Sequence, residues 1–380
     1  MILPLNYYDS IVQWHATLVD CAEKDAQDLL AAGWNQPLPT LTEKLNPNFE
    51  TAIQNEVDTF VRNSAKLGNC SEAFVREKLK TSEKGKAKIN AYLDQANYDY
   101  RCVLNFTLGG KKSFYFSDGL VQQLADTEMN VRADLLRLPF PSCMFVFTSR
   151  DAINSFHKFM PADRELLYDV PLTVFVSEFQ PLTGEDSRCL EIWAFHGADG
   201  RLLAGASRNL ALCDGMSIEE VLKTDWRSTH RGAEEESTRG SGIDLFYTDG
   251  LHFFRIVVNA ILYASSINAE LTDCPSIHDG LEERLKTLKS LARRDLYRAA
   301  QKASFLPYVL VGGSVKEVSG SRSASEALAS RTLTVRFSVR GHFRNQAFGP
   351  GHSQHRLKFI EPYLKGPEMA DLVNKPYCAR

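Results

Sequence analysis

The sequence lacks the motifs that mark the common enzyme families. It contains no His-Glu-x-x-His, no Gly-x-Ser-x-Gly and no dinucleotide-binding glycine fingerprint. The stretch Gly109–Ser113 is similar to the end of a phosphate-binding loop, but the earlier glycine that this loop requires is replaced by Asn105. A hairpin turn is the better interpretation of that stretch. Nothing in the sequence therefore marks a familiar metabolic enzyme, and no cofactor is expected.

Paired cysteines and long apolar runs are also missing. The eight cysteines are scattered and never occur as Cys-x-x-Cys, which indicates reduced thiols in a cytosol rather than a disulfide framework or a zinc knuckle. Residues Met1–Tyr8 lack the basic and apolar stretches of a signal peptide. The longest apolar run, Phe253–Ala264, is interrupted by Arg255 and Asn259 and is too short to span a bilayer. We expect a soluble cytoplasmic protein without membrane contact.

Acidic residues are absent from one window near the C-terminus. Between Arg331 and Ile360 there are six basic residues and no Asp or Glu. Because the whole chain carries a formal charge of −3, this window carries +6 and the remainder carries −9. Such a division predicts a dedicated anion-facing surface, and nucleic acid is the commonest large anion in a cell.

The same window has the pattern of a β-hairpin with one basic face. Apolar and polar residues alternate from Leu333 to Arg340, which places the arginines together on one side of a strand. The turn Gly349–Gly351 then allows Arg356–Ile360 to return as the partner strand. The predicted RNA-binding residues are Arg336, Arg340, His342, Arg344, Asn345, Gln346, His352, Arg356 and Lys358. Arginine matches phosphate geometry, and single-stranded RNA is the favoured partner because splayed bases stack on aromatic rings such as Phe343 and Phe348. The alternative is that the arginines pair with carboxylates elsewhere in the chain.

His342 is the candidate catalytic residue of this window. Histidine transfers protons near neutral pH, and a neighbouring arginine can stabilise charge in phosphodiester cleavage. His352 or His355 would then act as its partner, although a binding or structural role for His342 is favoured. No metal site is expected, because His352 and His355 have no accompanying cysteine or acidic ligand. The sequence leaves open whether the chain is an enzyme.

The order of patterns predicts an α+β fold in three regions. Residues 1–98 read as a helical N-terminal region, 99–318 as an α+β body with a mainly antiparallel mixed sheet and flanking helices, and 319–380 as a serine-rich connector followed by the basic C-terminal β-hairpin. Predicted strands are Cys102–Phe106, Phe145–Phe147, Leu172–Phe179, Cys189–Phe195, Leu202–Leu212 and Pro307–Val311. Predicted helices of the body are Asp118–Met129, Asp151–Phe159, Ser217–Lys223, Gly250–Ser266 and one long amphipathic helix, Leu281–Ala303, with a basic side.

Three of these segments, in the same order and with similar spacing, carry a family resemblance. They are the apolar helix Ile256–Tyr263, the strand Leu306–Gly312, and the C-terminal run from Val339–Phe343 through Arg356–Pro362. Over about residues 250–366 the chain resembles an anti-CRISPR family carried by phages and plasmids, whose named member acts against the type V-A effector nuclease. The resemblance implies an anti-defence protein, encoded by a mobile genetic element, that works in the cytoplasm of a bacterial host cell.

The resemblance also implies partners. It implies recognition of the N-terminal nascent peptide of a CRISPR effector nuclease at the ribosome, followed by loss of the corresponding mRNA. Candidate peptide-binding residues are Phe140, Phe145 and Tyr308, with Leu138–Phe145 as a candidate wall of a groove, although a buried core strand is the favoured interpretation of that stretch. The alternative function is an RNA-binding module or an endoribonuclease with His342 as acid or base. The sequence does not define the oligomeric state.

Overall fold

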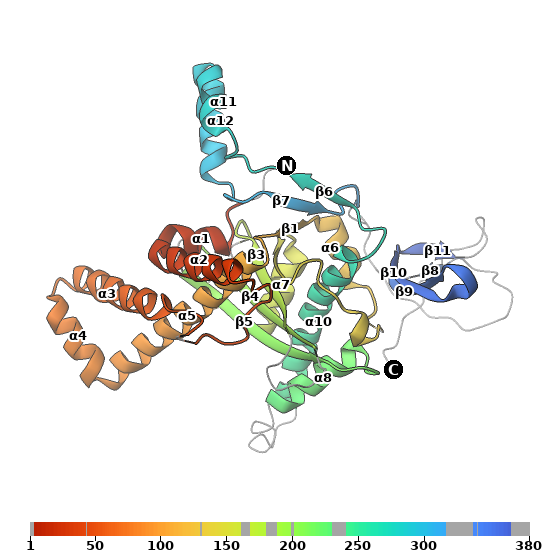
Figure 1. The fold of residues 1–380 in the computed structure, drawn as a ribbon, viewed down its shortest axis with the longest axis horizontal. Helices are drawn as coiled ribbons and strands as arrows, with labels where there is room; N and C mark the ends of the chain where they lie inside the picture. The colour runs from red at the N-terminus through yellow and green to blue at the C-terminus, as the bar shows by residue number, and fades with distance from the viewer. Residues whose placement is uncertain are drawn as a thin grey trace.

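We describe a computed structural model of the chain over residues 4–42, 44–129, 131–160, 168–179, 188–198, 201–229, 241–316, 337–339 and 341–365. A mixed seven-stranded sheet forms its centre (Figure 1). The strands are β1 Ser113–Phe116, β2 Ser142–Phe147, β3 Leu172–Phe179, β4 Arg188–Ala198, β5 Arg201–Leu212, β6 Leu271–Cys274 and β7 Tyr308–Val311. Their order is β5-β4-β3-β2-β1-β7-β6, and only the pairs of β1 with β2 and with β7 are parallel. The predicted α+β fold with a mainly antiparallel mixed sheet is confirmed.

Helices cover both faces of the sheet. On one face lie α1 Tyr7–Trp14, α2 Ala16–Ala31 and α5 Glu83–Leu108, and α3 Phe49–Leu67 and α4 Glu72–Thr81 pack beside α5 and extend away from the sheet. On the other lie α6 Asp118–Ala125, α7 Arg150–Phe159, α8 Ile218–Thr229 and α10 Ser241–Ala264. A hydrophobic core lies on each face of the sheet, and successive residues of β2 pack into the two cores alternately. Met144 and Val146 pack toward the N-terminal helices, and Phe145 and Phe147 pack toward α10. The segment Cys143–Phe147 of β2 is therefore apolar throughout rather than alternating.

Two predicted elements of the body are wrong. Cys102–Phe106 is not a strand, because it forms the buried C-terminal part of α5. A short apolar run that is buried on all sides shows no hydrophobic periodicity, so its sequence does not distinguish a helix from a strand. Leu281–Ala303 is not one helix but two, α11 Leu281–Thr287 and α12 Ser290–Gln301, which are separated at Leu288, where the backbone is extended. The serine-rich connector 319–330 lies outside the described residues.

A buried polar network joins α1 to α5. The Tyr7 hydroxyl donates to Oδ1 of Asp99 at 3.0 Å, and the Gln95 side-chain amide donates to the same atom at 2.8 Å. Burial of the carboxylate raises the pKa of Asp99 to about 6, and these hydrogen bonds oppose the shift only in part. The network therefore makes the stability of the N-terminal helical layer sensitive to pH.

We expect Asp99→Asn to remove a pH dependence of stability between about pH 4 and pH 6. The folded-state pKa is raised, so the contribution of Asp99 is fully present below its unfolded pKa and is lost as pH rises through the folded pKa. The loss amounts to about 3 kcal/mol, because one pKa unit corresponds to about 1.4 kcal/mol. Urea unfolding at pH 4, 5, 6 and 7.5 measures it. Asp94→Asn, at an exposed position of the same helix, is the control, and equal pH slopes for Asp99→Asn and the wild type would refute the expectation.

Candidate functional site

The C-terminal hairpin consists of β9 His342–Phe348 and β10 Gln354–Ile360, joined by a 3₁₀ turn, Pro350–His352. Gly349 and Gly351 have φ angles of +78° and +62°, which only glycine adopts readily. The predicted turn and return strand are thus confirmed. The pairing partner is different: β10 pairs with β9, and the described part of 333–340, β8 Phe337–Val339, pairs with β11 Tyr363–Lys365.

Gly341 separates β8 from β9. A Cβ atom at this position would lie 2.9 Å from the Thr127 hydroxyl and 3.0 Å from the Phe359 ring. The chain therefore passes against the end of α6 with no room for a side chain, and the two strand segments on either side of this point join different sheets. The resulting two small sheets lie beside the body, at the right in Figure 1.

The back of the hairpin is apolar and fixed to the body. The ring centroid of Phe359 lies 5.0 Å from that of Phe343 and 5.2 Å from that of Tyr263 on α10. The Asn268 side chain makes two hydrogen bonds to the Phe359 backbone, accepting from its N–H at 3.0 Å and donating to its carbonyl at 2.9 Å. Leu357 completes this contact with the main core. The hairpin is therefore held in one orientation, with its other face turned away from the body.

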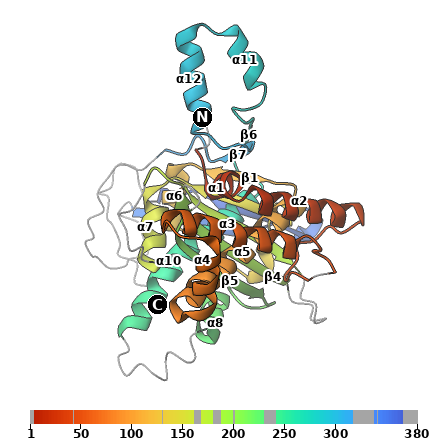
Figure 2. The same cartoon turned by 90° about the vertical axis from the view of Figure 1, so that its left-hand side faces the viewer.

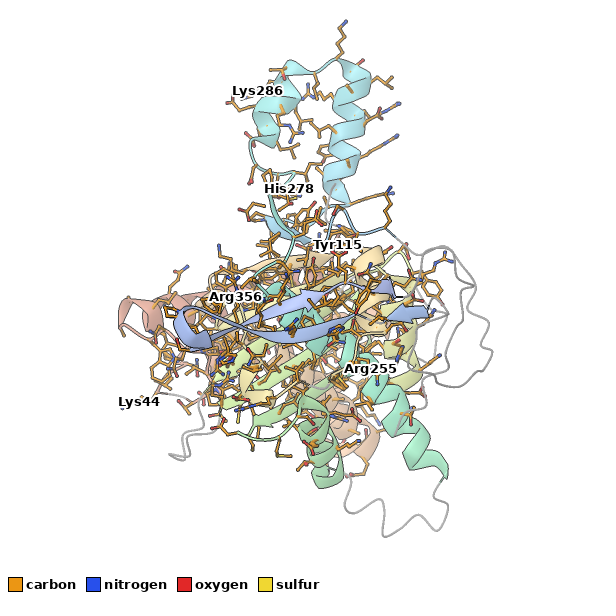
Figure 3. All side chains as sticks on the ribbon, turned by 90° about the vertical axis from the view of Figure 1, so that its right-hand side faces the viewer. Lys44, Tyr115, Arg255, His278, Lys286 and Arg356 are labelled. Atoms are coloured by element: carbon orange, nitrogen blue, oxygen red, sulfur yellow. The ribbon has the colours of Figure 1, made fainter. Side chains whose placement is uncertain are left out.

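That other face is polar and basic, and we call it the basic face. Because directly paired residues of an antiparallel ladder share a side, it consists of His342, Arg344, Gln346, Phe348, Gln354, Arg356, Lys358 and Ile360. The Arg356 guanidinium stacks 4.7 Å from the centroid of the Phe348 ring. No carboxylate of the described residues lies within 4.0 Å of Arg344, Arg356 or Lys358. These three cations therefore present a positive surface, and within the described chain they form no ion pairs. Figure 3 shows the hairpin crossing the body, with Arg356 labelled.

The structure brings together five of the predicted RNA-binding residues, namely His342, Arg344, Gln346, Arg356 and Lys358. Asn345 lies on the opposite side of the hairpin, paired with Leu357. Arg336 and Arg340 lie outside the described residues, and only the backbone of His352 is described, in the 3₁₀ turn.

The structure does not bring His342 and His355 together as an acid–base pair. His342 pairs with Ile360 at the start of the hairpin, whereas His355 pairs with Ala347 near its tip. Five residues along a strand correspond to roughly 17 Å, and the two imidazoles also lie on opposite faces. Of the two histidines, only His342 is on the basic face.

The predicted wall of a peptide groove divides into two parts. Leu138–Pro141 borders an open cavity of about 300 Å³, which we call the Phe140 cavity. Its other lining residues are Asn35, Gln36, Arg137, Glu178, Phe179 and Arg188. The remaining part of the stretch belongs to β2, and Phe145 has no exposed surface. Phe140 therefore lies where a ligand can reach it, and Phe145 does not.

An ion pair shapes the Phe140 cavity. Arg188 pairs with Glu178 and donates to the backbone carbonyls of Asp134 and Leu136 at 3.2 and 3.0 Å. Burial raises the pKa of Glu178, and its carboxylate accepts a hydrogen bond from the Leu138 N–H at 3.3 Å. These contacts hold the chain segment before Phe140 in a fixed path. Tyr308, the third predicted peptide-binding residue, instead lines a different cavity, of about 260 Å³, at the base of α12.

A polar cleft was not predicted from the sequence. Two cavities of about 460 and 600 Å³ share Gln122 and Asp151. The larger lies where β1 and β2 end and α6 and α7 begin, and the smaller is lined by α6, α7 and α10. Tyr115, Thr148 and Asp118 are linked there by hydrogen bonds of 2.8 and 3.0 Å. The carboxyl edge of adjacent parallel strands is a common place for ligands. The sequence signal for this cleft is the aromatic run of β1 followed by the serine N-cap of α6, which was not recognised as a strand followed by a helix.

These features define an α+β protein with an exposed basic hairpin and several open cavities around a central sheet. Within the described ranges, no three histidine, cysteine or acidic side chains gather as a metal site, and no helix has the length and apolarity that crossing a bilayer requires. The model of the AcrVA2-like family, anti-CRISPR type V subtype A2, matches residues 114–366, and the chain belongs to this family. Anti-defence activity is accordingly its function class. The family resemblance expected over about residues 250–366 is confirmed and extends to β1.

A solved structure, "Crystal structure of AcrVA2", is similar to this chain with a TM-score of 0.42 and 12% sequence identity, covering 94% of this chain and 97% of that chain. No curated protein matches the chain.

Proposed function

We propose that this protein recognises the N-terminal nascent peptide of a CRISPR effector nuclease and promotes loss of its mRNA during translation. The observation that carries the RNA part is the basic face, where Arg344, Arg356 and Lys358 are held together on a rigid hairpin without carboxylates of the described chain beside them. Such an arrangement suits the phosphates of a single-stranded message, and the Phe348 ring beside Arg356 adds a stacking surface.

The Phe140 cavity is the proposed peptide site. It combines apolar surface from Leu138, Phe140 and Phe179 with the charged pair Glu178 and Arg188. Small concave sites of this mixed kind fix one side chain of a ligand and orient its backbone. Peptide recognition at this cavity and RNA contact at the basic face are separate functions on separate elements, so variants can remove one without the other.

Co-expression with a type V-A nuclease tests the proposal. We expect the nuclease transcript to fall several-fold when this protein is present. Synonymous recoding of the first 30 or so codons is expected to preserve the loss, because the peptide is unchanged, whereas altering the peptide itself is expected to abolish it. Phe140→Ala is also expected to abolish it, and Phe74→Ala, at an exposed aromatic residue of α4, serves as the matched control.

Three outcomes would contradict the proposal. Unchanged transcript levels would exclude mRNA loss as the activity. Equal loss from nucleases with different N-terminal peptides would instead indicate an RNA-binding module without a peptide target. Cleavage of naked RNA by the purified protein, stopped by His342→Ala, would indicate an endoribonuclease.

A further inference from the structure

The helices α11 and α12 form an arm that stands away from the body. Figures 2 and 3 show the two helices rising side by side beyond the edge strand β6. No residue of α11 is buried, and Ala300 is the only buried residue of α12. Leu291 and Tyr297 are 63% and 52% exposed. The arm therefore has a large solvent-facing surface, and the described chain does not cover it.

The arm is strongly basic. Residues 281–302 contain three acidic side chains and seven basic ones, which gives the segment a net charge of +4. The basic residues are Arg284, Lys286, Lys289, Arg293, Arg294, Arg298 and Lys302, and all are exposed. None of them lies within 4.0 Å of a carboxylate of the described residues. The Arg284 guanidinium donates to the Ile277 carbonyl at the base of the arm, whereas among the described residues the arginines of α12 have no such hydrogen bond.

The two sides of α12 differ. Leu296 and Ala299 face the cavity at the base of the arm. At 100° per residue, Arg294, Tyr297 and Arg298 fall on the opposite, outward side, and Arg293 lies at its edge. Two guanidinium groups and one phenol ring therefore share this outward side, with the Arg293 guanidinium beside them, and the helix rises about 7.5 Å from Arg293 to Arg298.

We propose that the outward side of α12 is a second RNA-binding surface, which contacts the phosphates of the same RNA that the basic face of the β9–β10 hairpin binds; this rests on the proposed RNA contact of that hairpin. Charge complementarity favours a polyanion, because the arginines of the arm form no ion pair with a carboxylate of the described ranges. Arginine forks match phosphate oxygens, and an exposed tyrosine stacks on an unpaired base. The β9–β10 hairpin and the arm are both visible from one side of the molecule (Figure 3).

A comparison of short and long RNA tests this arm. The variant Arg293→Ala/Arg294→Ala/Arg298→Ala is compared with the wild type for binding to fluorescent single-stranded RNA of roughly 8 and 30 nucleotides. We expect at least a tenfold loss of affinity for the long RNA and little change for the short one, which the basic face alone accommodates. The slope of log affinity against log salt is expected to fall by about 2 for the long RNA, since each lost phosphate contact of a single strand removes about 0.7.

The outcomes separate the arm from the hairpin. Wild-type binding of the long RNA by the arm variant would overturn the proposal, whatever the hairpin does. If the arm variant loses affinity while an Arg344→Ala/Arg356→Ala variant does not, the hairpin contact fails and the arm contact stands. If the arm variant binds RNA normally but loses binding to poly-glutamate, the partner is an acidic protein and the RNA proposal is wrong. Lys80→Ala/Lys84→Ala, at exposed positions on α4 and α5, controls for general loss of positive charge.

Discussion

Replacing Arg344, Arg356 and Lys358 together with alanine is expected to weaken the binding of single-stranded RNA roughly 100-fold at low salt. All three side chains lie on the basic face, and no described carboxylate is close enough to neutralise them. A hydrogen bond that involves a charged group contributes about 1.5–3 kcal/mol, so the loss of two to three such contacts corresponds to this factor or more. The salt dependence of the affinity is expected to fall as well, because fewer counterions are released.

Fluorescence anisotropy at several salt concentrations measures this effect. The matched control is Asn345→Ala, which changes a side chain of the same hairpin on its opposite side. The three positions lie on the outward side, away from the Phe343–Phe359 contact, so the hairpin is expected to remain folded. RNA affinity and salt dependence equal to those of the wild type would show that the basic face does not bind RNA, and would remove the main structural support for the proposed function.

The basic face could be predicted from the sequence because two local rules coincide in it. A period of two determines which residues share a side, and a Gly-Pro-Gly turn fixes where the chain reverses. The identity of the partner strand could not be predicted. It depends on Gly341, which fits against Thr127 and Phe359, residues that only the tertiary fold brings there. Asn345 was included among the predicted RNA-binding residues because it is polar. The register of β9 and β10 places it on the side of the hairpin opposite to the basic face.

A short apolar run that is enclosed by protein does not show from the sequence whether it is a helix or a strand. The helix α7 was predicted correctly because one side of it is apolar and the other is polar. Cys102–Phe106 and β1 are both apolar runs enclosed by protein, and the first is a helix while the second is a strand. What distinguishes them is the length of α5, which continues without interruption from Glu83 to Leu108. A local window of five residues does not contain that information.

The candidate peptide site shows the same limit. Phe140 and Phe145 are both aromatic and only five residues apart. Phe140 follows a proline and precedes another, which keeps it out of the sheet and beside a cavity. Phe145 lies in β2, between β1 and β3, so a ligand cannot reach it. Depth in a sheet depends on which strands pair on either side, and that pairing is a property of the whole chain.

Phe145→Ala is expected to lower the free energy of unfolding by about 3–5 kcal/mol, the range for removing a buried phenylalanine ring. The side chain has no exposed surface, and its ring centroid lies 5.0 Å from that of Phe116, 5.7 Å from that of Phe114 and 6.5 Å from that of Phe147. Truncation would leave a cavity among rings that belong to two adjacent strands and therefore cannot close it without moving the sheet. Phe145→Leu, which keeps most of the volume, is expected to cost less than half as much.

Urea unfolding of Phe145→Ala, Phe145→Leu and Phe140→Ala distinguishes a residue of the core from a residue of the site. Phe140 is only partly buried, so we expect its truncation to cost about 1 kcal/mol while removing peptide-dependent transcript loss. Phe145→Leu is expected to retain that loss, because its stability is largely kept and its ring touches no ligand. A stable Phe145→Leu protein without activity would place Phe145 in the peptide site after all, and would mean that the sheet opens around β2 when the peptide binds.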